Sequence, residues 1–220
     1  MAHAFIIGGA GQIARKMTPD LVSKGYQVSS LYRHDEQHQQ LADLGATPVK
    51  GDLMKLGVSD LQTQIAHCDI VVFAAGAGGA GADLTRAIDG EGLEKAVSAA
   101  KAAGVQRFYL ISVFPEAGRT ADLGDGFEVY MQVKKMADVH LVASGLDFAI
   151  LRPGTLADDT PTGKVSAGLA VPYGTIARGD VAAFLAELIN QPNVINTIIE
   201  LSPGDTPITQ AVSQLAPKAV

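Results

Sequence analysis

The feature that most constrains the fold lies near the start of the chain, where an apolar run leads into glycines three residues apart. Phe5-Ile6-Ile7 is followed by Gly8 and Gly11, and Ala14 comes three residues later. This spacing predicts a buried strand that turns sharply into a helix. Gly8 allows the tight turn, Gly11 leaves room for a pyrophosphate to approach the backbone, and Ala14 lets the helix pack close to the sheet.

The first residues of the predicted helix carry backbone N–H groups that no carbonyl of the same helix can accept. Gln12 and Ile13 occupy these positions, directly after Gly11. Their N–H groups and the positive end of the helix dipole favour a bound anion. We therefore expect Gly8, Gly11, Gln12 and Ile13 to form the pyrophosphate site of a dinucleotide. An ordinary glycine-rich turn is the alternative, because such turns are common.

Strand and helix patterns alternate along the whole chain, which is typical of a parallel sheet with helices on both faces. Of 220 residues, 47% are apolar and 18% are charged, which suits strands buried on both faces. We expect one α/β domain over residues 1–220, a doubly wound Rossmann sheet of about seven strands, with a small irregular cap at 155–178. The expected strands are Ala4–Ile7, Gln27–Tyr32, Thr47–Lys50, Ile70–Ala74, Arg107–Ser112, Phe148–Arg152 and Thr197–Leu201. The expected helices are Gly11–Lys24, Glu36–Leu44, Val58–Ile65, Asp83–Ala103, Val129–Ser144, Asp180–Asn190 and Ile208–Leu215.

Charge and composition exclude several classes of partner. The chain has 17 basic and 23 acidic residues, a formal net charge of −6, and no dense basic run. Nucleic acid and anionic membranes are therefore not expected as partners. The single Cys68 excludes an internal disulfide and a multi-cysteine metal site, and the histidines show no metal-ligand spacing. With no targeting segment or membrane-spanning run, we expect a cytoplasmic protein that binds a small molecule, its oligomeric state left open.

The second predicted strand ends in Leu31-Tyr32-Arg33-His34. Proteins that select NAD usually place an acidic residue at this point, whereas a basic residue accommodates the additional phosphate of NADP. Arg33 therefore predicts NADP(H) as the cofactor. The alternative is that Arg33 is a solvated residue at the strand end and that Asp35 bonds the ribose.

Small residues and an acidic turn follow the third and fourth predicted strands. Gly51-Asp52-Leu53 lies where the adenine end of a dinucleotide would rest, although Asp52 alone could simply cap the next helix. Ala74-Ala75-Gly76 allows a ligand to lie against the backbone at the end of the fourth strand. Gly78-Gly79-Ala80-Gly81 is either part of that contact or a flexible surface loop.

Taken together, these motifs resemble the atypical short-chain dehydrogenase/reductases, small NADP-binding proteins close to the extended, epimerase-like branch. The likeness covers nearly the whole chain. The resemblance implies that the turn Arg152-Pro153-Gly154 follows the sixth strand and that Pro153 and Gly154 border the nicotinamide. The motifs that carry it are Gly8-x-x-Gly11-x-x-Ala14, Arg33, Gly51-Asp52-Leu53, Ala74-Ala75-Gly76, the stretch 105–112 and the stretch 144–154.

The resemblance also implies a catalytic set of a Ser, a Tyr, a Lys four residues after the Tyr, and an Asn earlier in the chain. Ser112 ends the fifth predicted strand, and Tyr130 and Lys134 share one face of a predicted helix. A nearby ammonium favours the phenolate, so we expect a Tyr130 pKa below about 10. Tyr130 would then exchange a proton with a substrate oxygen while hydride moves at the carbonyl carbon. In this family Ser112 would hold that oxygen, and Lys134 would also bond the nicotinamide ribose.

Three features leave the catalytic interpretation open. Asp89 stands where the family has the Asn, so the proton relay of the standard enzymes is uncertain. Lys135 adjoins Lys134 and gives a second candidate for the cation. The alternative for Tyr130 is an amphipathic helix residue with its ring in the core and its hydroxyl in water.

The preferred function is an NADP-binding oxidoreductase or epimerase-like enzyme acting on a small carbonyl or hydroxyl compound. One alternative is a regulatory protein that senses NADP without turnover, as NmrA-like proteins do. Another is a flavin or biliverdin reductase-like activity, in which solvent supplies the proton and Tyr130 is dispensable. The loop between Ser112 and Tyr130, which includes Arg119 and Asp122, is expected to contact the substrate.

Overall fold

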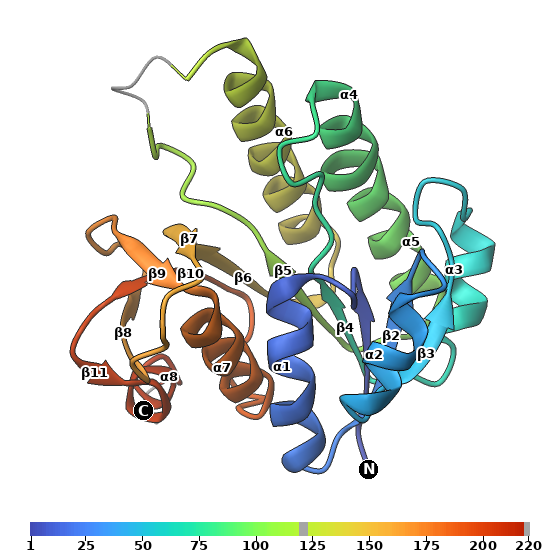
Figure 1. Cartoon of the computed structure of the whole chain (residues 1–220), viewed down its shortest axis with the longest axis horizontal. Helices are drawn as coiled ribbons and strands as arrows, with labels where there is room; N and C mark the ends of the chain where they lie inside the picture. The colour runs from blue at the N-terminus through green and yellow to red at the C-terminus, as the bar shows by residue number, and fades with distance from the viewer. Residues whose placement is uncertain (119–122, 218–220) are drawn as a thin grey trace.

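The computed structural model of the chain describes residues 1–118 and 123–217. Arg119 and Asp122, in the loop expected to contact the substrate, lie outside the described residues. The elements alternate as the sequence predicts (Figure 1). The strands are β1 (His3–Ile7), β2 (Gln27–Tyr32), β3 (Thr47–Lys50), β4 (Ile70–Phe73), β5 (Arg107–Ile111), β6 (Asp147–Pro153), β7 (Thr155–Ala157), β8 (Lys164–Gly168), β9 (Thr175–Ala177), β10 (Thr197–Pro203) and β11 (Thr206–Pro207). The helices are α1 (Gln12–Ser23), α2 (Gln37–Asp43), α3 (Val58–Ile65), α4 (Ala82–Thr85), η1 (Arg86–Gly92), α5 (Leu93–Ala103), α6 (Asp125–Val142), α7 (Arg178–Ile189) and α8 (Ile208–Ser213).

A nine-stranded sheet forms the centre of the molecule, in the order β11-β8-β10-β6-β5-β4-β1-β2-β3. The strands from β3 to β10 in that order pair in parallel, and β8 pairs antiparallel with both β10 and β11. The order reverses between β1 and β4, which is the place where ligands bind in doubly wound sheets. The Rossmann class is therefore confirmed, with nine strands where fewer were expected.

Two hydrophobic cores lie on the two faces of this sheet, and β1 contributes to both. Ala4 and Ile6 pack in the core that includes α1 and α7, while Phe5 and Ile7 pack in the core that includes α3, α5 and α6. All four side chains are fully buried. The alternation follows from the two-residue period of a strand, and it explains why this run is apolar throughout. Figure 1 shows α1 and α7 side by side on their face of the sheet.

The helix expected over Asp83–Ala103 is instead three successive segments, α4, the π-helix η1 and α5. Gly90 and Gly92 lie in η1, where their low helix propensity favours a departure from α-helical geometry. A Cβ on Gly92 would lie 2.9 Å from the Leu53 side chain, so η1 also packs too closely to admit a larger residue there. The widened turn buries Asp89, whose exposed fraction is 2%. Single π turns of this kind occur frequently at functional sites.

Helix α6 begins at Asp125, four residues before the expected start at Val129. Two acidic residues, Asp125 and Glu128, occupy its first turn, where they interact favourably with the positive end of the helix dipole. The apolar pattern that was used to locate the helix does not extend to these residues. The start of the helix was therefore placed too late.

The segment 155–178, expected as an irregular cap, contains three short strands. Strand β8 joins the main sheet, and β7 and β9 form a separate parallel pair. Gly154 is essential to this arrangement because a Cβ there would lie 2.0 Å from the carbonyl oxygen of Gly174. None of the helices in residues 1–118 and 123–217 has the length and apolar character that crossing a bilayer requires.

Candidate functional site

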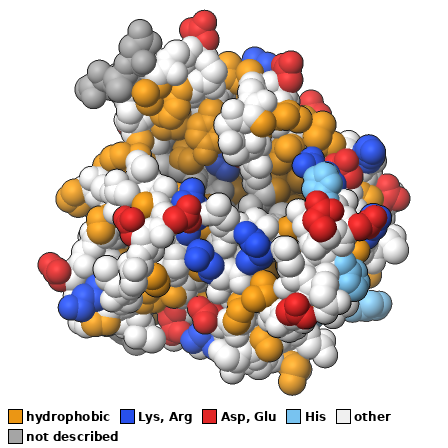
Figure 2. Space-filling model, in the orientation of Figure 1, with side chains coloured by type: hydrophobic (Ala, Val, Ile, Leu, Met, Phe, Trp, Pro, Cys, Tyr) orange, Lys and Arg blue, Asp and Glu red, His pale blue; other side chains and the backbone are white. Residues whose placement is uncertain are grey.

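A cavity of about 850 Å³ opens at the carboxyl ends of β1, β4, β5 and β6. Figure 2 shows hydrophobic side chains gathered on the α6 side of the hollow in this face of the molecule. The cavity brings together most of the residues that the sequence predicts for the site. These are Gly11, Gln12, Ile13, Ala74, Ala75, Gly76, Asp89, Ser112, Tyr130, Lys134, Pro153 and Gly154.

The turn between β1 and α1 is held against the end of β4. Gly8 has a φ of +83°, and a Cβ on it would lie 2.6 Å from Cα of Ala75, so both conformation and space require glycine. Gly8 therefore packs against the end of β4 and does not itself line the cavity. Gly9, which the motif did not single out, has no room for a side chain either, because a Cβ would lie 2.5 Å from Cβ of Ser30. Gly11 caps α1, and its backbone N–H bonds the Gly8 carbonyl at 2.9 Å.

A second cavity of about 490 Å³ lies beyond the end of β2 and is lined by Arg33, His34, Lys50, Gly51, Asp52 and Lys55. Arg33 is exposed, and its Nε donates to Nε2 of His34 at 2.9 Å. Asp35 forms an ion pair with Lys50. The carboxylate that was the alternative ribose partner is therefore engaged by Lys50, and Nζ of Lys55 lies 4.0 Å from Oδ2 of Asp52. Arg33 is the cation lining this cavity for which the described residues provide no acidic partner.

Asp52 and Leu53 are placed differently from each other. Asp52 lines the second cavity, and its Oδ1 accepts a hydrogen bond from the backbone N–H of Met54 at 3.0 Å, so it also stabilises its own turn. Leu53 is buried in the core and lines neither of the two cavities. Its carbonyl oxygen accepts a hydrogen bond from Nζ of Lys95 at 2.6 Å. A contact between Leu53 and the cofactor stays a prediction.

Lys134 and Asp89 form a buried ion pair in the wall of the large cavity. Nζ of Lys134 lies 3.4 Å from Oδ1 of Asp89, and the two side chains are 4% and 2% exposed. The same ammonium donates to the carbonyl oxygen of Ile111 at 2.9 Å, and Oδ2 of Asp89 accepts from the N–H of Ala77 at 2.9 Å. Because both charges are out of water, removing either one would leave the other uncompensated.

Tyr130 lies one helical turn before Lys134, but its pKa is shifted in the opposite direction to the one that the sequence predicts. Burial raises the pKa of Tyr130 above its ordinary value of 10.0, and the negative charges of Asp89 and of Tyr173, once ionised, raise this pKa further. The expectation of a lowered pKa is therefore wrong, because burial of the phenol and the charge of Asp89 both disfavour the phenolate. Tyr130 keeps its proton at neutral pH, which suits a proton donor and not a base.

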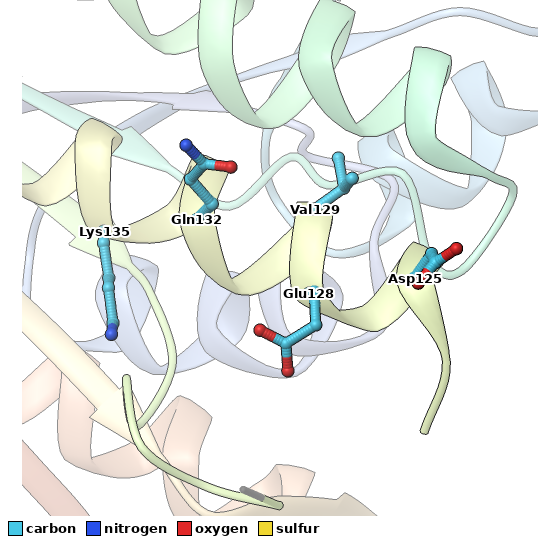
Figure 3. Close-up of a pocket in the computed structure, with 5 residues that line it drawn as sticks. All are labelled: Asp125, Glu128, Val129, Gln132 and Lys135. Atoms are coloured by element: carbon cyan, nitrogen blue, oxygen red, sulfur yellow. The ribbon is translucent and has the colours of Figure 1, made fainter. Parts of the chain in front are cut away.

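The structure distinguishes Lys134 from its neighbour Lys135. Lys135 forms an ion pair with Glu116 and lines a shallow hollow of about 450 Å³ on the outer side of α6. Figure 3 shows that Glu128 and Lys135 leave α6 on the same side, and the lining residues of this hollow all belong to α6. None of the predicted site residues lines it. Lys134 is therefore the lysine that lines the large cavity.

Aromatic residues from three separate segments line the open end of the large cavity, and sequence reasoning missed most of them. Phe114 and Tyr173 pack edge to face with their ring centroids 5.2 Å apart, and Phe127 and Tyr130 pack with centroids 6.4 Å apart. The Tyr173 hydroxyl is 2.7 Å from Oγ1 of Thr155. No motif links these segments, because they meet only in the folded chain.

A buried carboxylate behind Ser112 was also missed. Asp138 is 4% exposed and forms an ion pair with Arg152 at 2.8 Å. It stands four residues after Lys134 on the buried face of α6, so helical spacing alone could have indicated it. Within the part of the chain that the structure describes, no group of three or more His, Cys, Asp or Glu side chains is arranged to hold a metal ion.

Comparison with known proteins agrees with this geometry. The model of a family described as NAD(P)H-binding matches residues 8–192. The chain belongs to this NAD(P)H-binding family. The matched residues include the glycine turn, the large cavity and both ends of α6.

Relatives within and around the family span almost the whole chain. YhfK of Bacillus subtilis, an uncharacterized sugar epimerase, is 34% identical, and the match covers 96% of this chain and 99% of YhfK. A structure from Bacillus halodurans, described as a candidate NAD-dependent epimerase/dehydratase, is 34% identical with a TM-score of 0.87, covering 97% of this chain and 100% of that one. ChuY, an anaerobilin reductase of Escherichia coli, is 23% identical with a TM-score of 0.75, covering 93% and 98% of the two chains, and shows the shared fold alone. The resemblance to the atypical short-chain dehydrogenase/reductases is confirmed.

The residues of this NAD(P)H-binding chain fit a nicotinamide cofactor. Gly11 presents no side chain at the mouth of the turn, and Gln12 and Ile13 line the cavity at the start of α1. Their N–H groups have no acceptor within the helix, as the pyrophosphate site requires. Ala74, Ala75 and Gly76, which lie against this turn at the end of β4, line the cavity with small residues.

Proposed function

We propose that the protein is an NADPH-dependent reductase that acts on a small carbonyl compound. The observation that carries this proposal is that Ser112, Tyr130 and Lys134 line the same cavity as the start of α1. The pyrophosphate would bind at Gln12 and Ile13, and the nicotinamide would lie near the turn after β6. A substrate held in the aromatic end of the cavity would then meet the three polar side chains.

Each polar side chain has a distinct task in this proposal. When bound, the cofactor supplies hydride to the carbonyl carbon. Tyr130 donates its phenolic proton to the carbonyl oxygen, and the Ser112 hydroxyl contacts the same oxygen. Lys134, whose ammonium is held beside Asp89 in the cavity wall, would bond the nicotinamide ribose and so position the cofactor next to Tyr130.

The neutral, protonated state of Tyr130 suits it to begin a carbonyl reduction better than to begin an alcohol oxidation or an epimerisation. Oxidation of an alcohol, the first step of a redox epimerase, needs a phenolate that removes the hydroxyl proton. Burial and Asp89 oppose that phenolate. A phenol with a raised pKa is instead protonated across the physiological pH range and is ready to donate.

The second cavity supports NADPH over NADH. Arg33, Lys50 and Lys55 surround it, and Asp35 is paired with Lys50. A phosphate on the adenosine ribose would receive charge-assisted hydrogen bonds there, which are about twice as strong as neutral ones. Among the described residues lining this cavity, the carboxylate available to the diol of NADH is Asp52, which already accepts from the N–H of Met54 and lies 4.0 Å from Nζ of Lys55.

The aromatic end of the large cavity favours a substrate with a flat apolar part. Phe114, Phe127 and Tyr173 provide this surface. The charged side chains of the cavity are already paired, Lys134 with Asp89 and Arg178 with Asp158 at 3.1 Å. A strongly charged substrate, such as a nucleotide sugar, would therefore lack a free ionic partner among the described lining residues.

One observation favours a second candidate, a protein that binds NADP as a signal without turnover. Asp89 replaces the family's Asn and engages both Lys134 and the N–H of Ala77. Asp89 thereby holds Lys134 and the loop after β4 in place, and this role does not require proton transfer. Cofactor binding is common to both candidates, and turnover separates them.

The test begins with calorimetry of NADPH and NADH binding, followed by an NADPH oxidation assay with quinones, aromatic ketones and aliphatic aldehydes. We expect turnover with at least one flat carbonyl compound, and a loss of about 10²- to 10⁴-fold in kcat for Tyr130→Phe. Tyr26→Phe is the matched control. The Tyr26 hydroxyl donates to the carbonyl oxygen of Ile189 at 3.2 Å, and Tyr26 does not line the cavity. Binding without any turnover would support the signalling role. Equal rates for Tyr130→Phe and wild type would mean that solvent supplies the proton, as in the flavin or biliverdin reductase alternative.

The pH profile gives a further check on the role of Tyr130. A proton donor works below its pKa and fails above it. Because the pKa of Tyr130 lies above its ordinary 10.0, loss of the Tyr130 proton should not lower wild-type kcat at any pH below that value. A fall in kcat around neutral pH that disappears in Tyr130→Phe would contradict the assignment.

A further inference from the structure

Two buried oxygen atoms belong to Ser112, which lines the large cavity, and to Asp138 on the buried face of α6. Among the described residues, neither Oγ of Ser112 nor Oδ1 of Asp138 has a hydrogen-bond partner of good geometry. The two groups are nevertheless close enough for the Ser112 hydroxyl to lower the pKa of Asp138. Buried polar atoms are almost always satisfied, so an unsatisfied pair beside a cavity indicates groups that change partners in function.

The rest of the Asp138 carboxylate is fixed in place. Nε of Arg152 donates to Oδ2 at 2.9 Å, and Nη2 of the same guanidinium lies 2.8 Å from this oxygen. Arg152 belongs to β6, directly before the turn that borders the cavity, and Asp138 belongs to α6. Because Arg152 holds Oδ2, Oδ1 is the oxygen left for Ser112.

We propose that Asp138 is a positioning residue that decides which partner the Ser112 hydroxyl proton has. When Asp138 is ionised, Ser112 donates to Oδ1, and its proton is turned away from the cavity. When Oδ1 carries a proton, Asp138 donates to Oγ of Ser112, and the Ser112 proton is free to bond the substrate oxygen. In both forms Oδ2 accepts from Arg152.

The surroundings of Asp138 make this exchange accessible. Burial raises the pKa of Asp138 above its ordinary 3.8, and Ser112, Arg152 and Lys134 offset part of that rise. These three groups come from the end of β5, from β6 and from α6, the elements that supply its charged and polar neighbours. Asp138 therefore takes up its proton at a higher pH than an exposed aspartate does.

The inference rests on the proposed reductase activity for its kinetic test. Wild-type kcat/KM for the carbonyl substrate should rise roughly two- to tenfold as the pH falls through the pKa of Asp138, the worth of one neutral hydrogen bond. Asp138→Asn mimics the protonated acid, because its amide oxygen can accept from Arg152 while its NH₂ donates to Ser112. This variant should hold the acid-limit kcat/KM at every pH, and Ser112→Ala should lose the rise and stay low. A rise that persists in either variant would overturn the proposal.

Glu187→Gln is the matched control, because Glu187 is also a buried carboxylate with one cationic partner, Lys24 at 2.6 Å. It lines none of the cavities described above and should keep the wild-type pH profile. Melting temperatures of all variants separate lost structure from lost positioning. A merely structural role of Asp138 would lower the melting temperature and reduce kcat/KM equally at all pH values.

An NMR titration tests the contact without any turnover. In protein labelled with ¹³C at the aspartate carboxyls, the Asp138 resonance is the one missing from Asp138→Asn. If Ser112 donates to the ionised carboxylate, Ser112→Ala should raise the Asp138 pKa, whereas Tyr26→Phe should leave it unchanged. An unchanged pKa in Ser112→Ala would refute the contact even if the enzyme is active. Absence of turnover together with the expected pKa rise would instead count against the proposed function alone.

Discussion

The two edges of the sheet carry similar residue types but differ in what these residues can do. At the amino edge, Nε2 of His3 lies 2.9 Å from Oγ of Ser29, and its Nδ1 lies 3.5 Å from Sγ of Cys68. The backbone N–H of His3 donates to Asp69 at 2.8 Å. A nucleophile, a base and a carboxylate therefore meet there, as they do in many catalytic sites.

The carboxyl edge differs from the amino edge in the space that its backbone leaves. Both edges carry side chains of reactive types. There Gly8, Gly11 and the small residues from Ala74 to Gly76 leave a cavity that reaches Ser112 and Tyr130. At the amino edge Cys68 is buried, and burial raises the pKa of its thiol to about 11. Reactive side chains become a site where the backbone leaves space for a ligand. Without that space, desolvation makes the same groups inert.

The largest effect should follow from removing the cation of the carboxyl edge. Lys134→Met leaves Asp89 buried without its partner, which costs about 3–5 kcal/mol of stability and endangers folding. The double variant Lys134→Met with Asp89→Asn removes both charges and should fold. We expect it to bind NADPH more weakly and to lose about 10²-fold or more in kcat, because no ammonium then holds the nicotinamide ribose in position. Circular dichroism and the NADPH oxidation assay measure the two effects.

Lys135→Met is the control for this variant, since Lys135 pairs with Glu116 on the outside of α6. It should keep wild-type kcat. If the Lys135 variant were inactive and the Lys134 double variant active, the contrast between the buried and the outer face of α6 would be reversed.

A smaller effect should appear at the second cavity. Arg33→Ala removes one charge-assisted hydrogen bond to the ribose phosphate, so the Kd for NADPH should rise about 10- to 100-fold. The Kd for NADH should change little. Arg86→Ala is the control, because Arg86 is exposed, pairs with Asp83 and lines neither cofactor cavity. Equal losses for both cofactors in Arg33→Ala, measured by calorimetry, would place the ribose phosphate elsewhere.

The carboxyl edge was predictable from sequence to the extent that it depends on local patterns. The turn at Gly8 and Gly11, the small residues after β4, and the shared helix face of Tyr130 and Lys134 each lie within one short stretch. Parallel strands end at one edge of a sheet, so these stretches had to meet. These side chains can therefore be located near a cavity without knowledge of how the core packs.

The electrostatics of the site were not predictable in the same way. The pKa of Tyr130 depends on Asp89, whose carboxylate is turned inward by the π-helix η1. The sequence pattern indicated an ordinary helix there, so the pairing of Lys134 with Asp89 could not be foreseen. The aromatic wall has a similar origin, because Phe114 and Tyr173 come from segments 59 residues apart that no periodicity connects. Non-local packing sets the chemistry, while local patterns set the location.

The smallest effect is expected at the amino edge, and it tests the comparison most directly. Cys68→Ala should leave kcat and the Kd for NADPH unchanged, because Cys68 lies at the opposite end of the strands from the cavity. In the native protein, iodoacetamide should alkylate Cys68 slowly. Burial raises the pKa of the Cys68 thiol from its ordinary 9.0 to about 11. The thiolate fraction near neutral pH is therefore about 100-fold lower than that of an exposed cysteine, and burial also slows access of the reagent. Mass spectrometry with and without denaturant measures the ratio of the two rates. Fast alkylation in the native state would mean that the amino edge opens to solvent and holds a usable nucleophile. The presence of a cavity at the carboxyl edge would then no longer explain the difference between the two edges.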